Sequence, residues 1–192
     1  MTKNFRFLTL IIFFVFAVAS GAKSQASYES AHAQARKFPL SSFDRTDCRL
    51  KARYQECPSK VMTGILGQGK GAVPVLISQL NDSGRTKEPI EPDWSYTDSG
   101  DVAYFILISL FTNGDGTFNL PDVPTWQTVM NGCTTGVEGC WREYVRKNGR
   151  QSVQQAWMKA WDLNKDKISW DAKEKCFRVA GVITGRGKAG KK

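Results

Sequence analysis

Apolar side chains recur at helical spacing between Cys140 and Trp161. The longest apolar stripe begins at Val153. Its other members lie three, four, seven and eight positions further on, and they are Ala156, Trp157, Ala160 and Trp161. Polar and charged residues fill the positions between them. Gly149 interrupts the pattern, and a glycine at such a point typically ends a helix in the left-handed conformation. We therefore expect two consecutive amphipathic helices, the second of which buries Trp157 in the core.

Two shorter helices are predicted in the first half of the chain. Cys57-Pro58-Ser59 supplies a capping residue and a proline of the kind that begin a helix. A glycine-rich turn follows this helix, and Ala72–Leu80 then forms the next one, with Pro74 in its first turn. The apolar face of the first helix consists of Val61, Met62, Ile65 and Leu66.

The segment Val102–Phe111 is apolar on almost every side. This composition suits a fully buried strand as well as a buried helix. We favour a central buried helix, which Ser99 would cap and which would carry Asp101 in its first turn. The expected fold class is therefore mainly α: a small irregular helical domain with long loops and one or two local disulfides.

The N-terminal residues follow the order of a secretory signal peptide. Lys3 and Arg6 precede an apolar run of 13 residues, Phe7–Ala19, and small residues come directly after it. The run is shorter than the roughly 20 residues that a transmembrane helix needs. We expect cleavage after Ala22 or Ala26, a periplasmic or extracellular location, and no transmembrane anchor in the mature protein.

The formal net charge of +9 is concentrated at the two ends of the chain. Six of these charges belong to the predicted signal peptide and to the C-terminal tail, which leaves about +3 on the body. A body charge of this size is ordinary for a soluble domain, so we consider nucleic acid an unlikely partner. The predicted organisation is a signal peptide at 1–22, a polar arm at 23–43, a single helical domain at 44–182 and a basic disordered tail at 183–192.

The cysteine spacing predicts two short disulfide loops. The five cysteines are Cys48, Cys57, Cys133, Cys140 and Cys176. An exported protein meets conditions in which disulfides persist. Proximity in sequence favours Cys48–Cys57 and Cys133–Cys140, with Cys176 unpaired, although the sequence leaves other pairings open. A zinc site of the Cys/His type is not indicated, because there is no C-x-x-C pair and His32 is the single histidine.

The polar stretch Asn81–Gly100 contains the candidate ligand-binding residues. Loops of this length in compact domains are often functional. Trp94 has no apolar partner at helical or strand spacing, so we expect it to contact a ligand and to be dispensable for folding. A carboxylate beside a tryptophan can act as a general acid, although most acids in such a chain are surface charges. The candidates are Glu88, Glu91, Asp93, Trp94 and Tyr96.

The segment Phe111–Asp122 resembles a calcium loop of the EF-hand or dockerin kind. Its candidate ligands are Asn113, Asp115, Asn119 and Asp122. The resemblance is incomplete, because Phe111 stands where the family places an aspartate. The alternative interpretation is a turn rich in Asn, Asp and Gly. No cofactor other than calcium is indicated.

Two further resemblances bear on fold and function. The segment ILGQGKGAVPVLISQLND resembles one unit of a HEAT-type helical repeat, and a plain helical hairpin is the alternative. The combination of CPSKVMTGILGQGKGAVPVLISQL, DWSYTDSGDVAYFILISLF and GCWREYVRKNGRQSVQQAW resembles a group of small exported bacterial proteins without an assigned function. The sequence favours an exported binding or interaction module whose partner is a protein or an envelope glycan. The alternative is a carboxylate-dependent hydrolase or binder acting on envelope polysaccharide.

Overall fold

The structure is a computed structural model of the chain, and it describes residues 40–43, 53–57, 59–87 and 94–181. Several predicted features lie outside these residues. They are the signal peptide at 1–22, most of the polar arm at 23–43, the tail at 183–192, Cys48, and the acidic residues Glu88, Glu91 and Asp93.

The described part of the chain is mainly helical, as the sequence predicts. Its α-helices are α2 (Lys60–Gly67), α3 (Ala72–Gln79), α4 (Ser99–Phe111), α5 (Trp126–Met130), α6 (Gly136–Asn148) and α7 (Arg150–Asn164). Its short 3-10 helices are η1 (Leu40–Ser42), η3 (Tyr54–Glu56), η4 (Gly69–Gly71) and η5 (Lys165–Lys167). None of the described helices has the length and apolar character needed to cross a membrane.

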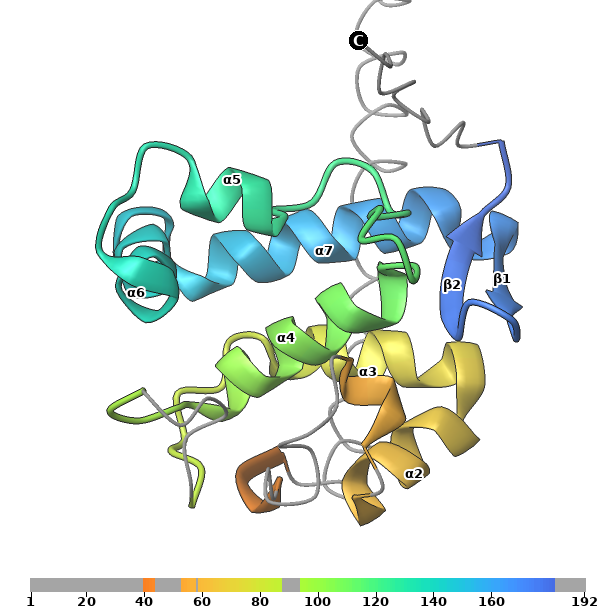
Figure 1. Cartoon of the computed structure of the whole chain (residues 1–192), viewed down its shortest axis with the longest axis horizontal. Coiled ribbons are helices and arrows are strands. Elements are labelled where there is room, and N and C mark those ends of the chain that lie inside the picture. The colour runs from red at the N-terminus through yellow and green to blue at the C-terminus, as the bar shows by residue number, and fades with distance from the viewer. Residues whose placement is uncertain (1–39, 44–52, 58, 88–93, 182–192) are drawn as a thin grey trace, which may run out of the picture.

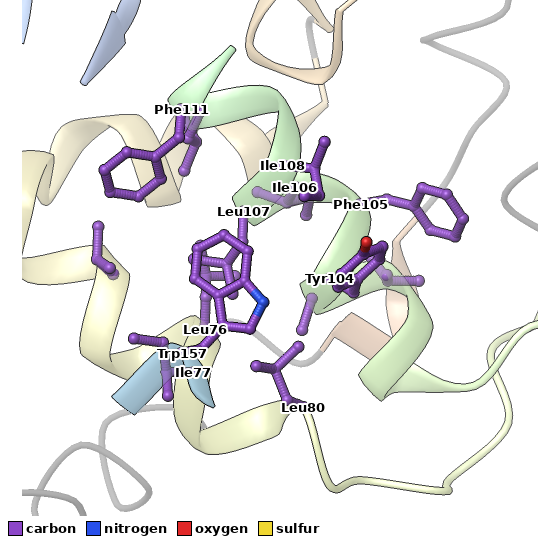
Figure 2. Packing of buried hydrophobic residues seen from close by; sticks show 14 of the residues in the cluster. Leu76, Ile77, Leu80, Tyr104, Phe105, Ile106, Leu107, Ile108, Phe111 and Trp157 are labelled. Carbon is purple, nitrogen blue, oxygen red and sulfur yellow. The ribbon is translucent and has the colours of Figure 1, made fainter. Parts of the chain in front are cut away.

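Helix α4 forms the centre of the core. It is buried on nearly every side, packs along α3, and is reached by the indole ring of Trp157 from α7 (Figure 2). The predicted central helix and the predicted burial of Trp157 are both confirmed. The predicted cap is wrong by one residue. Asp98 is the N-cap and forms a capping box with Asp101, because a carboxylate there accepts the orphan backbone N–H of the first turn.

Local sequence signals place the start of α2 and the boundary between α6 and α7 where they were expected. The Ser59 hydroxyl accepts a hydrogen bond from the Met62 amide at the start of α2. Gly149 has a φ of 78° and separates α6 from α7. This positive φ allows α7 to leave α6 in a new direction, which places α6 at one end of the molecule (Figure 1).

A two-stranded antiparallel sheet follows α7 and was not predicted. Its strands are β1 (Ile168–Asp171) and β2 (Cys176–Val179), and Trp170 lies opposite Phe177. The mainly helical fold therefore also contains a small sheet, which the sequence analysis did not include. The hydrophobic alternation in this region is loose because each strand has only four residues. Figure 1 shows this sheet at the end of the molecule opposite to α6.

The predicted Cys133–Cys140 disulfide is confirmed. Cys57 is also disulfide-bonded, but Cys48 lies outside the described residues, so the Cys48–Cys57 pairing stays a prediction. Cys176 is buried and free, as expected. The Cys133–Cys140 bond ties the turn after α5 to the second turn of α6.

Candidate functional site

The Trp94 segment, residues 94–98, packs against the hydrophobic core and is not an open binding loop. The Trp94 side chain is only 6% exposed, and its ring meets Phe105 of α4 edge-to-face at 5.1 Å between centroids. The expectation that Trp94 stands clear of the core is therefore wrong. Its apolar partners come from α4, so no periodicity within the loop could reveal them.

The Tyr96 ring is covered by two arginines. The guanidinium carbons of Arg85 and Arg142 lie 4.2 and 3.6 Å from the ring centroid. Arg142 also donates a hydrogen bond of 2.6 Å to the Tyr96 carbonyl oxygen. Cation–π contacts of this kind hold an aromatic ring in place. Both guanidinium groups occupy the space over the ring where a ligand would have to stack.

The Glu138 carboxylate near the Trp94 segment is engaged by its neighbours. It accepts hydrogen bonds from the Ser95 hydroxyl at 2.8 Å and from Arg142 at 2.9 Å. Partial burial raises its pKa, but the hydrogen bonds from Ser95 and Arg142 together hold the pKa below the ordinary value of 4.5. A general acid needs the opposite shift. This carboxylate therefore fixes the loop to α6 and does not fit the role of a proton donor.

The carboxylates of Asp98 and Asp101 bind Arg150 at the start of α7. The Arg150 guanidinium donates to them at 2.8 and 2.7 Å, and the Trp141 indole N–H donates to Asp101 at 2.7 Å. Asp101 is fully buried. Losing one partner of such a buried pair leaves an uncompensated charge, so the cluster locks α4, α6 and α7 together.

The segment that resembles a calcium loop is closed by its own hydrogen bonds. The side chains of Asn113 and Asp115 both accept from the backbone N–H of Thr117, at 2.7 and 2.9 Å. The Asn119 amide is buried and donates to the Phe111 carbonyl oxygen at 3.0 Å. Asp122 has a φ of 63°, which is typical of an Asn/Asp turn position. In the part of the chain that the structure describes, no cluster of three His, Cys, Asp or Glu side chains could hold a metal ion.

An apolar pocket with a volume of about 330 Å³ lies beside the sheet, and we name it the Trp170 pocket. Its walls come from α2, η4, α4 and both strands. The lining residues are Ile65, Leu66, Gly69, Leu110, Trp170 and Phe177. This volume is at the lower end of the range for small-molecule and side-chain sites.

Trp170 is the one exposed residue in the lining. Its side chain is 41% exposed, whereas Phe177 opposite is buried. The two rings meet edge-to-face at 5.0 Å between centroids. This contact fixes one edge of the Trp170 ring on the buried partner. The exposed remainder of the indole forms a rim for the pocket.

Two polar contacts lie next to the elements that line the pocket. Lys70 follows Gly69 of the lining and donates a hydrogen bond of 2.9 Å to the Lys165 carbonyl oxygen, which ties η4 to η5. Arg178 and Asp171 form an ion pair at 2.9 Å on the other face of the sheet, because Arg178 lies opposite Ser169 and side chains alternate between the two faces.

Comparison of the chain with protein-family models, with curated proteins and with solved structures finds no match. The candidate site therefore rests on the geometry of this chain. Trp170 is not among the site residues predicted from the sequence, although Ile168 and Trp170 lie two positions apart on one face of β1. That spacing places Trp170 next to the core but does not show that its end of the strand is uncovered.

Proposed function

We propose that this protein is an exported interaction module that receives an apolar side chain of a partner protein in the Trp170 pocket. The observation that carries the proposal is a half-exposed tryptophan on the rim of an apolar pocket. Tryptophan is enriched among the residues that dominate protein–protein binding energy, particularly where it borders a dry pocket. The signal peptide predicted at 1–22 and the disulfide in the domain support a protein that acts outside the cytoplasm.

The lining chemistry favours a protein side chain over a glycan as the occupant. Of the lining side chains, only Trp170 carries a group able to form a conventional hydrogen bond, its indole N–H. Sugar hydroxyls lose free energy when they are buried without hydrogen-bond partners. An aliphatic or aromatic side chain has no such cost.

The alternative, a carboxylate-dependent hydrolase acting on envelope polysaccharide, has less support. Glu138 is held by Ser95 and Arg142, and Asp98 and Asp101 are held by Arg150. None of these three is a free carboxylate facing a second one across a cleft, which glycoside hydrolysis needs. Glu88, Glu91 and Asp93 lie outside the described residues, so their part of this hypothesis stays a prediction.

Site-specific photo-crosslinking in the exporting cell tests the proposal. The photoreactive residue p-benzoylphenylalanine is placed at position 170 or, as a matched control, at position 163. Leu163 is even more exposed, at 61%, but it does not line the pocket. We expect a discrete adduct with one protein at position 170 and none at position 163. Equal capture at both positions would contradict the proposal.

A second variant separates loss of the pocket from loss of the fold. Leu66→Arg puts a charge into the pocket lining from a half-buried position. We expect this variant to fold, as judged by its circular dichroism, and to abolish the adduct formed from position 170. An adduct that persists in the folded variant would show that the partner binds elsewhere.

A further inference from the structure

A second hollow lies at the opposite end of the molecule, between α5 and α6, and we name it the polar groove. Its volume is about 310 Å³, close to that of the Trp170 pocket. Its lining differs in kind, because most of the side chains carry hydrogen-bonding groups. The lining residues are Thr128, Val129, Asn131, Gly132, Cys133, Cys140, Glu143, Tyr144, Lys147 and Asn148.

Several polar groups in this lining are not used by the fold. No hydrogen bond or ion pair within the described ranges engages the side chains of Asn131, Glu143 or Lys147, or the hydroxyl group of Tyr144. Glu143 and Lys147 are four residues apart on α6, in the order that favours an ion pair across one helical turn. They nevertheless form no ion pair with each other. Both side chains are exposed beside the groove and available to a ligand.

The walls of the groove are held in place without these polar groups. The Cys133–Cys140 disulfide joins the turn after α5 to α6 at the groove lining. The Tyr144 ring lies nearly parallel to the buried Trp141 ring, at 6.3 Å between centroids. Asn148 donates from its side chain to the Tyr144 carbonyl oxygen at 2.8 Å. The lining is therefore preorganised, which reduces the entropy that binding has to offset.

The charges in the lining are balanced. Glu143 is its one acid and Lys147 its one base, and the remaining polar groups are hydroxyls and amides. Burial raises the pKa of the Tyr144 hydroxyl, so this group stays a neutral donor and acceptor at neutral pH. Such a lining has no net attraction for an anion or a cation. It matches a neutral ligand that both donates and accepts hydrogen bonds.

We propose that the polar groove is a binding site for a neutral oligosaccharide. Sugar hydroxyls donate and accept hydrogen bonds, as the amides of Asn131 and Asn148 do. Tyr144 adds an aromatic ring beside them. The site binds and does not hydrolyse, because Glu143 is the single carboxylate in the lining and glycoside hydrolysis needs two. The site is independent of the Trp170 pocket, because the strands β1 and β2, which contribute Trp170 and Phe177 to that pocket, lie at the end of the molecule opposite to α6 (Figure 1).

Nuclear magnetic resonance titration of the isotope-labelled mature chain tests this proposal. The probes are maltohexaose, cellohexaose and chitohexaose, each added to about 10 mM so that millimolar affinities are detected. We expect at least one of the three to shift backbone resonances of α5 and α6 and to leave those of β1 and β2 unchanged. The absence of shifts with all three probes would overturn the proposal. Shifts produced only by a zwitterionic dipeptide, added as a fourth probe, would overturn it as well.

Three variants locate the binding. Glu143→Gln and Lys147→Met should each weaken the affinity for the active probe about tenfold, the usual cost of a lost hydrogen bond to a charged group. Arg146→Gln is the matched control, because Arg146 is an exposed residue of α6 that does not line the groove. An equal loss in the control would overturn the assignment. Trp170→Ala should leave the sugar affinity unchanged, so failure of one proposal is distinguishable from failure of the other.

Discussion

Trp94 is buried and Trp170 is exposed, whereas their sequence surroundings suggest the reverse. Trp94 lies among prolines, acids and serines, yet its side chain is 6% exposed and packs against α4. Trp170 lies in an alternating strand pattern, yet its side chain is 41% exposed. The solvent exposure of each residue is therefore the opposite of the exposure that its neighbours in the chain indicate.

Contacts with residues far away in the sequence explain this difference in burial. The Trp94 segment is held by Phe105 of α4, and by Glu138 and Arg142 of α6. These residues supply the burial that the loop itself lacks. Trp170 is paired with Phe177, but it lies toward the end of a sheet of only two strands. In the part of the chain that the structure describes, no third strand extends this sheet. Part of the Trp170 ring stays exposed and borders the apolar pocket.

The largest expected effect compares the two tryptophans directly. Trp94→Ala should lower the free energy of unfolding by about 3–5 kcal/mol, from lost burial and the cavity left against Phe105. Trp170→Ala should cost less than about 1 kcal/mol, because its ring is half exposed and the substitution opens no closed cavity. Urea unfolding of the two variants beside the wild type measures both values. A near-zero cost for Trp94→Ala would restore the earlier interpretation of its loop as a free binding segment.

The parts of the fold that the sequence predicted are those set by local rules. The spacing of Val153 and Trp157 fixes the buried face of α7, and Ser59 caps α2 through a hydrogen bond to a residue three positions on. The unpredicted parts depend on distant pairs. The sheet needs β2 opposite β1, and the Trp170 pocket combines residues from Ile65 to Phe177. A pocket that spans the chain in this way leaves no periodic signal.

The second prediction uses the Cys133–Cys140 disulfide to separate the two regions. Replacing both cysteines by serine should lower the free energy of unfolding by about 2–3 kcal/mol, because the short loop no longer restricts the unfolded chain. The bond holds the N-terminal part of α6, which carries Glu138 and Arg142. Amide hydrogen exchange should therefore become faster in the Trp94 segment and stay unchanged in β1 and β2. Faster exchange in both regions alike would contradict this division of the molecule.

The smallest expected effect depends on pH and concerns the contact that holds the Trp94 segment to α6. Hydrogen bonds from Ser95 and Arg142 outweigh partial burial and lower the pKa of Glu138 from its ordinary value of 4.5. The ionised carboxylate therefore stabilises the fold at pH values above 4.5, and this contribution is lost as the pH falls through the lowered pKa. Glu138→Gln lacks the contribution at every pH.

Urea unfolding of the wild type and Glu138→Gln between pH 7 and pH 3 checks the sign of this effect. The wild type should be more stable at neutral pH by up to about 1 kcal/mol, the range for ion pairs near the surface. The difference in free energy of unfolding between the wild type and Glu138→Gln should shrink as the pH falls below 4.5. Trp170→Ala is the matched control, because it removes no titratable group and its difference from the wild type should not depend on pH. A Glu138→Gln difference that stayed constant would mean that the carboxylate contributes only through its shape, and that Arg142 alone holds the Trp94 segment against α6.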